Sequence, residues 1–269
     1  MSPSPRMPVV FFGHGSPMIA LEANQTSRCW AEVAAAIPRP KAILAVSGHW
    51  ETQVTAVTAM ARPRTIHDFS PRFPQALFDM QYPAPGDPAL ARRVAELLAP
   101  RPVALDEGEW GLDHGTWSVL VKAYPQADIP VVQLGMDVNL TPAERFAIGH
   151  QLAPLRDEGV LIIGSGNIVH NLPTMTWDHQ FGPAYDWAER FNGQMRQAIL
   201  ADQPQRVIDF ADLGRDAELS APTPDHFWPL LYVLGAREPG DRARLVNDRI
   251  EYGSLAMTMV VLEDGGAAA

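Results

Sequence analysis

The stretch VVFFGHGSP, residues 9–17, is a short apolar run that ends in a glycine-rich turn carrying His14. Three more apolar runs follow along the chain, at Ala42 to Val46, Ile129 to Leu134 and Val160 to Ile163. Short runs rich in Val and Ile, separated by longer segments of helical period, are typical of α/β domains. Each run therefore predicts a buried strand.

Helix signals lie between and after these runs. Residues 89–98 follow Asp87-Pro88 and place their leucines on one face. Thr141-Pro142-Ala143-Glu144 is a capping box that predicts a helix to about residue 157, and Thr223-Pro224-Asp225-His226 repeats this start. The apolar stretch from Ser254 to Leu262 predicts a last strand.

These patterns predict one α/β catalytic domain over residues 1–269, with a central mixed sheet flanked by helices. No repeat, charge run or Gly/Ser linker divides the chain. Residues 1–7 and 264–269 are expected to form flexible tails, and the proline-rich residues 61–88 a long functional loop. In open α/β sheets ligands bind beyond the carboxyl ends of the strands, so we expect the active site there.

Composition excludes several classes of protein. The 269 residues contain 21 Lys+Arg against 31 Asp+Glu, a net charge of −10, which argues against a nucleic-acid or anionic membrane partner. Cys29 is the single cysteine, so neither an internal disulfide nor a cysteine-rich metal site is possible. No signal peptide or membrane span is recognisable. A cytoplasmic protein is the expectation.

Three histidines follow the ends of predicted strands. His14 and His49 stand in the glycine-rich turns Gly13-His14-Gly15 and Ser47-Gly48-His49, and His170 follows the turn after residue 163. Because the carboxyl ends of these strands share one edge of a sheet, we expect the three side chains to converge. Imidazoles without thiolates suit Zn, Fe, Cu or Ni rather than Ca or Mg.

The remaining histidines have less specific settings. His114 follows an acidic stretch and suits a proton donor or a surface-loop residue, whereas His226 suits a metal ligand or a helix-start residue without a partner. His67 lies in the proline-rich segment and could contact substrate. His150 and His179 are expected to face solvent.

The chain resembles the class III extradiol ring-cleaving dioxygenases, and in particular their 4,5-DOPA dioxygenase branch. The resemblance extends in order from about residue 8 to residue 262. It is carried by segments 13–18 (GHGSPM), 47–50 (SGHW), 65–69 (TIHDF), 82–86 (YPAPG), 113–117 (DHGTW), 166–172 (GNIVHNL) and 222–226 (PTPDH).

This resemblance implies one divalent metal, Zn2+ or Fe2+, held by His14, His49 and His226. It implies that His170 lies beside the metal and acts as acid or base, although the branch also counts this residue among the metal contacts. It implies that His114 takes part in oxygen or proton handling. The implied reaction opens the ring of a catechol such as DOPA with O2, and Fe2+ is the metal expected to support it.

One position departs from the wider class, which uses two histidines and one carboxylate. The third ligand here is His226, and only Asp225 and Glu251 are acidic substitutes. A zinc hydrolase or lyase would use the same three histidines to generate hydroxide, so it remains the alternative enzyme. A metal- or aromatic-binding protein without turnover is the third hypothesis, which His114 and His170 make less favourable.

Overall fold

Four parallel strands form the centre of the sheet, in the order β7, β2, β8, β1. The structure is a computed structural model that describes residues 6–266. The strands are β1 Val9–Gly13, β2 Ala42–Thr52, β7 Val131–Asp137 and β8 Val160–Gly166. They are buried almost throughout, as expected for parallel strands covered on both faces, and each overlaps a predicted run. The predicted turn at Ser47-Gly48-His49 is wrong, because β2 continues past Val46 to Thr52 and contains His49.

Three antiparallel pairings and the parallel pair of β3 with β5 extend this centre into an eight-stranded mixed sheet, which confirms the predicted fold class. The full order is β5-β3-β7-β2-β8-β1-β12-β9. The added strands are β3 Ala56–Thr58, β5 Ala104–Asp106, β9 Asp241–Val246 and β12 Met259–Asp264. Two small sheets pair β4 Arg64–Thr65 with β6 Gly111–Leu112, and β10 Ile250–Glu251 with β11 Leu255–Ala256.

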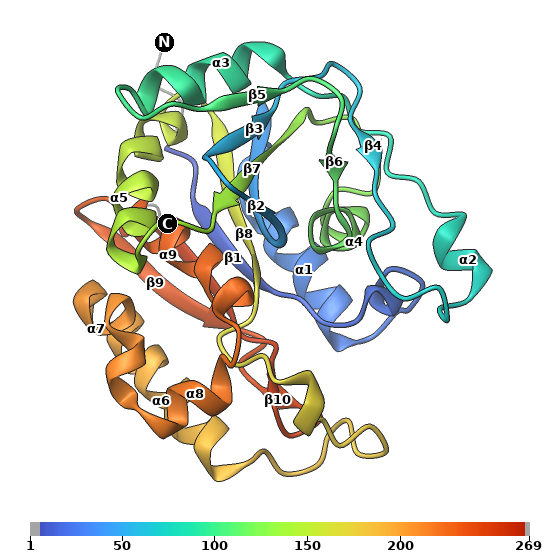
Figure 1. The fold of residues 1–269 in the computed structure, drawn as a ribbon, viewed down its shortest axis with the longest axis vertical. Helices are drawn as coiled ribbons and strands as arrows, with labels where there is room; N and C mark the ends of the chain where they lie inside the picture. Colours follow the sequence, from blue (N-terminus) through green and yellow to red (C-terminus); the bar gives the residue numbers. More distant parts are fainter. Residues whose placement is uncertain (1–5, 267–269) are drawn as a thin grey trace.

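Helices cover both faces of the sheet (Figure 1). Alternate residues of β1 mark the faces, since Phe11 and Phe12 belong to different apolar clusters. The Phe12 face carries α1 Gln25–Ala36, α2 Gln75–Phe78 and α4 His114–Ala123. The Phe11 face carries α3 Pro88–Leu97, α5 Pro142–Leu152, α6 Asp186–Leu200, α7 Pro204–Ile208, α8 Arg215–Ser220 and α9 Trp228–Gly235. No helix among residues 6–266 is long and apolar enough to cross a membrane.

The two predicted capping boxes have different outcomes. Thr141 and Glu144 form the reciprocal bonds of a capping box at the start of α5, as predicted, and a 3-10 turn over residues 153–156 follows the helix. Thr223 makes no side-chain cap, and a 3-10 turn, Pro224–His226, precedes α9. His226 therefore lies in a turn rather than in the first turn of an α-helix.

The predicted single strand from Ser254 to Leu262 is wrong, because it is divided between β11 and β12. Met257 and Thr258 connect the two strands and cross directly over Gly13, where a Cβ atom would lie 2.5 Å from the Met257 carbonyl carbon. Residues on both sides of the break are buried, so the apolar pattern continues through it without a signal.

Both expected tails include residues that belong to the fold. Met7 is buried, and Asp264 pairs with Asp241 at the edge of the sheet. Residues 1–5 and 267–269 of the expected tails lie outside the described residues.

Candidate metal centre

Three histidines meet at the carboxyl ends of β1 and β2. His14 follows β1, His49 lies in β2, and His226 comes from the turn before α9. Each offers a nitrogen, and the three atoms lie within 4.8 Å of one another. The register of β2 against β7 shifts between Val46 and Glu51, and such an irregularity re-aims side chains next to a site.

Close backbone packing brings His226 to the strand ends. The backbone N–H of Asn167 donates to the His226 carbonyl oxygen at 2.8 Å. A Cβ atom on Gly166 would lie 2.1 Å from that same oxygen, so only glycine allows this approach. The glycine-rich end of β8 is thus the surface against which the third histidine is positioned.

Each of the three imidazoles has an oxygen partner at Nδ1. For His14 it is the Ser165 hydroxyl at 2.9 Å, and for His226 it is the Asp225 carboxylate at 2.5 Å. The Nδ1 atom of His49 lies 3.3 Å from Oδ2 of Asp68. These oxygens assign the proton to Nδ1 in each ring and leave Nε2 as a lone pair, the arrangement usual for metal-binding histidines.

The hydrogen bonding of Ser165 makes this assignment firm for His14. The Ser165 hydroxyl donates its one proton to the carbonyl oxygen of Gly115, so it can only accept from His14 Nδ1. Nε2 of His14 then lies 3.3 Å from Nε2 of His49, with lone pairs on both atoms. Two nitrogens bound at about 2.0–2.1 Å to one tetrahedral zinc ion would be separated by a similar distance. The three residues therefore fit a shared divalent cation.

Burial keeps these rings neutral. It lowers the pKa of His14 and of His226 well below the ordinary value, with the neighbouring histidines adding to the shift. It also lowers the pKa of His49 to about 3, an effect that His114 strengthens and Asp68 opposes. Neutral imidazole is the form that binds metal, so the site is ready for a cation at neutral pH.

His170 lies beside the three-histidine group and outside it. Its ring stacks on that of His226, with centroids 3.7 Å apart and planes inclined by 3°. Among the described residues none hydrogen-bonds to the His170 imidazole, which lines the same cavity. Burial lowers its pKa to about 4. This placement favours a base over a fourth ligand.

His114 and His49 face one carboxylate, that of Asp68. The ring centroids of the two histidines are 3.9 Å apart, and Nδ1 of His114 lies 3.0 Å from Oδ1 of Asp68. Gly115 makes this approach possible, because a Cβ there would lie 2.7 Å from the His49 ring. Although burial raises the pKa of Asp68, its hydrogen bonds and the charges of His114 and His49 lower it below the ordinary value.

Asp68 was not among the predicted site residues, whereas its neighbour His67 was predicted as a substrate contact. His67 Nε2 bonds to the carbonyl oxygen of Met80 at 2.9 Å, and its ring packs among Phe69, Phe78 and Trp117. His67 is thus a packing residue outside the cavity lining. The signal that could have identified Asp68 is an acidic residue in a segment expected to be functional.

The two acidic substitutes for a third ligand are engaged elsewhere. Asp225 is the partner of His226 Nδ1. Glu251 accepts a hydrogen bond from Gln180 and lies 2.6 Å from Arg249. His150 and His179 are exposed, as predicted.

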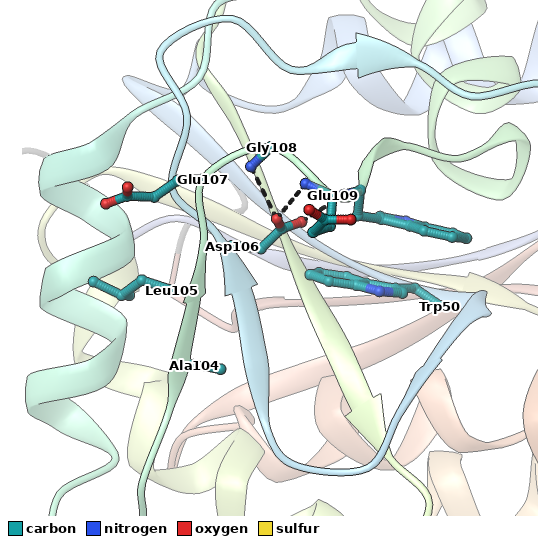
Figure 2. Close-up of a pocket in the computed structure, with 8 residues that line it drawn as sticks. Trp50, Ala104, Leu105, Asp106, Glu107, Gly108 and Glu109 are labelled. Carbon is teal, nitrogen blue, oxygen red and sulfur yellow. Dashed lines mark hydrogen bonds between the residues drawn. The ribbon is translucent and has the colours of Figure 1, made fainter.

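The histidines open into a cavity of about 790 Å3. Its apolar wall includes Phe69, Phe73, Met175 and Trp177. A second hollow lies near the end of β2, where Trp50 and Trp110 stack with planes inclined by 4° and Asp106 binds the backbone of the following turn (Figure 2). None of its lining residues is a histidine. The chemistry of this chain is therefore concentrated in the larger cavity.

Comparisons with known proteins agree with this geometry. The family described as "Catalytic LigB subunit of aromatic ring-opening dioxygenase" matches residues 8–262. A relative from Escherichia coli (strain K12), "4,5-DOPA dioxygenase extradiol", is 50% identical over 96% of this chain and 95% of its own length. A relative of the same name from Portulaca grandiflora is 38% identical, covering 91% and 92%.

A solved structure shows the same fold. The crystal structure of an uncharacterized protein, JW3007, from Escherichia coli K12 superposes with a TM-score of 0.83 at 45% identity, covering 95% of this chain and 99% of that one. Match length, identity and fold agree across almost the whole molecule. The chain therefore belongs to the family of the catalytic LigB subunit of aromatic ring-opening dioxygenases.

Proposed function

We propose that the protein opens the ring of a DOPA-like catechol with O2 at one Fe2+ ion held by His14, His49 and His226. The observation that carries the proposal is the convergence of three Nε2 lone pairs beside two further histidines in one cavity. A bound divalent metal would bring the two catechol oxygens and O2 together and stabilise negative charge. The family match favours this reaction over the zinc hydrolase alternative.

His170 is the proposed base. It lines the cavity beside the metal group, its neutral ring has a free lone pair, and its position against His226 fixes its plane. It would take a hydroxyl proton from the incoming catechol. General bases of this kind contribute about 10²- to 10⁴-fold to rate.

His114 is proposed to move the second proton. Asp68 faces its Nδ1 atom, which leaves Nε2 to accept a proton from the cavity and return it to the opening ring. Phe69 packs edge-on against the ring, with centroids 5.5 Å apart. The Asp68 carboxylate would hold the ring with Nε2 toward the cavity.

The cavity suits a catechol with a charged side chain. Its volume lies within the range of about 300–1,000 Å3 usual for small-molecule sites, so a ring and a substituent both fit. Arg72 and Glu22 contribute opposite charges to the lining. A zwitterionic amino-acid side chain matches this mixture, and DOPA carries one.

The test is O2 uptake by Fe2+-loaded enzyme with DOPA under reducing conditions, together with the appearance of a yellow ring-opened product. We expect one O2 consumed per catechol, loss of about 10²- to 10⁴-fold in kcat for His170→Ala, and unchanged metal content in that variant. His150→Ala, on the exposed face of α5, is the matched control and keeps full activity.

Full activity in His170→Ala removes the base assignment. Turnover that needs Zn2+ and ignores O2 contradicts the dioxygenase proposal and supports the hydrolase.

A further inference from the structure

Among residues 6–266, Asp68 is the one carboxylate within ion-pair distance of two histidine rings of the cavity. Its Oδ2 atom is 3.3 Å from Nδ1 of His49, and its Oδ1 atom is 3.0 Å from Nδ1 of His114. Oδ1 also accepts the backbone N–H of His114 at 2.8 Å. Each carboxylate oxygen therefore lies within ion-pair distance of one histidine ring, and Oδ1 is also held by the backbone of α4.

The segment around Asp68 is fixed against α4. The backbone N–H of Ile66 donates to the Leu112 carbonyl at 2.8 Å, and the Ile66 carbonyl accepts from the Trp117 indole at 2.8 Å. His114 is the first residue of α4, so the carboxylate lies at the positive end of that helix. The segment 61–88 thus positions the Asp68 carboxylate beside His49 and His114.

Asp68 differs in this respect from the other two oxygen partners of the metal group. Ser165 and Asp225 each face one histidine ring, His14 and His226. Asp68 faces His49, a ligand, and also His114, which lies outside the three-nitrogen group of His14, His49 and His226. One carboxylate consequently sets the orientation of a ligand ring and of a proton-handling ring.

We propose that Asp68 is a positioning residue that couples metal binding to proton transfer: it holds His49 with Nε2 toward the metal and holds His114 with Nε2 toward the substrate. The role of Asp68 toward His114 rests on the proposed function of His114, whereas its role toward His49 does not. Loss of such an outer partner typically costs about 10- to 100-fold in metal affinity.

The experiment is a double-mutant cycle with Asp68→Asn, His114→Ala and the combined variant. The affinity for Zn2+ is measured by competition with a chelator, and kcat and KM are measured with Fe2+ and DOPA. We expect Asp68→Asn to weaken Zn2+ binding about 10- to 100-fold in both backgrounds, and His114→Ala alone to leave it unchanged. With Fe2+ at concentrations that saturate every variant, we expect Asp68→Asn to lower kcat in the wild-type background and to have no further effect on kcat in His114→Ala.

Matched controls separate positioning from folding. Asp79→Asn removes an exposed carboxylate from the same segment, where it accepts a hydrogen bond from Gln75, and should leave both affinity and kcat unchanged. Asp68→Glu restores a carboxylate and should recover part of the Zn2+ affinity. Circular dichroism of each variant without metal should match that of the wild type.

Wild-type Zn2+ affinity in folded Asp68→Asn overturns the coupling to His49, and independent, multiplying losses of kcat overturn the coupling to His114. The chelator competition needs no substrate. If affinity falls as expected while no catechol is turned over, the proposed function fails and the role of Asp68 toward His49 stands.

Discussion

Polar side chains are buried at both ends of strands β1 and β8, and the two ends differ in how these side chains are paired. At the amino ends, Arg156 precedes β8 and lies against Met7, which precedes β1. At the carboxyl ends lie His14, which follows β1, and Ser165, the next-to-last residue of β8. The two clusters therefore share a scaffold.

The amino-end cluster is complete within the protein. The Arg156 guanidinium donates to the carbonyl oxygens of Met7 and Ala236 and to both oxygens of Asp241, at 2.5 and 3.0 Å. The side chains of Arg156 and Asp241 are 0% and 1% exposed. Removing either partner of such a buried pair would leave an uncompensated buried charge, and the paired groups offer nothing to a ligand.

The carboxyl-end cluster presents nitrogen lone pairs that a ligand could use. Its three Nδ1 atoms face oxygens, whereas the Nε2 lone pairs of His14 and His49 face each other at 3.3 Å without a proton between them. A shared cation would be bound by both lone pairs. Buried nitrogens whose lone pairs face one another, rather than burial of polar groups as such, distinguish the end of this sheet that fits a metal.

The largest expected effect is at the carboxyl end. In His14→Ala and His49→Ala we expect bound metal to fall from about one ion per chain to nearly none and ring-opening activity to disappear, because each variant removes one of three ligands. Elemental analysis and circular dichroism check this. Unchanged metal content in either folded variant contradicts its assignment as a ligand.

The next largest effect is expected at the amino end, where stability rather than metal content should change. Arg156→Met leaves the Asp241 carboxylate buried without its partner, so the free energy of unfolding should fall by about 3–5 kcal/mol while folded protein keeps its metal. Urea unfolding and elemental analysis of the same sample measure both. Arg93→Met, which breaks an exposed pair with Glu158, is the control and should change stability little. Loss of metal from folded Arg156→Met would contradict the conclusion that the amino-end cluster has no part in metal binding.

Acid should weaken the amino-end cluster. Burial raises the pKa of Asp241, but hydrogen bonds from Arg156 and the Glu238 N–H bring it below the ordinary value. A carboxyl group with a lowered pKa stabilises the fold above its unfolded pKa of about 3.9, and this contribution is lost as the pH falls through the folded pKa.

Asp241→Asn should therefore destabilise the metal-free protein at pH 7, and progressively less as the pH falls from about 4 through the lower folded pKa, below which the wild-type carboxyl group is itself protonated. Urea unfolding of both proteins across this range makes the comparison. A stability difference that stays constant with pH would show that the ionised carboxylate is not the source of the stabilisation.

The smallest expected effect is at His67. His67→Phe keeps the ring packing and loses the bond to the Met80 carbonyl, so the free energy of unfolding should fall by about 0.5–1.5 kcal/mol with metal content and kcat unchanged. A change in kcat without a change in stability would instead return His67 to the substrate site.

The sequence predicts the framework of this molecule well because its signals are local. Apolar runs gave the four central strands, and the Thr141 capping box gave the start of α5. The convergence of His14 and His49 also follows from local information, because both stand at or near the ends of parallel strands.

What the sequence does not predict depends on contacts between distant residues. Asp68 and His67 are neighbours in an irregular segment, where no strand or helix period tells which side chain reaches the site. Ser165 is identified as the partner of His14 only by a contact spanning 151 residues. The break between β11 and β12 was missed because Met257 is as buried as the strands it joins.

The central claim is that the carboxyl-end cluster is completed by a cation. Its most direct test is the free energy of unfolding of wild type and His226→Ala, each measured with a chelator and with Zn2+ at about 100 times the dissociation constant of the wild type. The account predicts a metal-linked gain of about 2.7 kcal/mol in the wild type and nearly none in His226→Ala. An equal gain in both proteins, or none in the wild type, would contradict it.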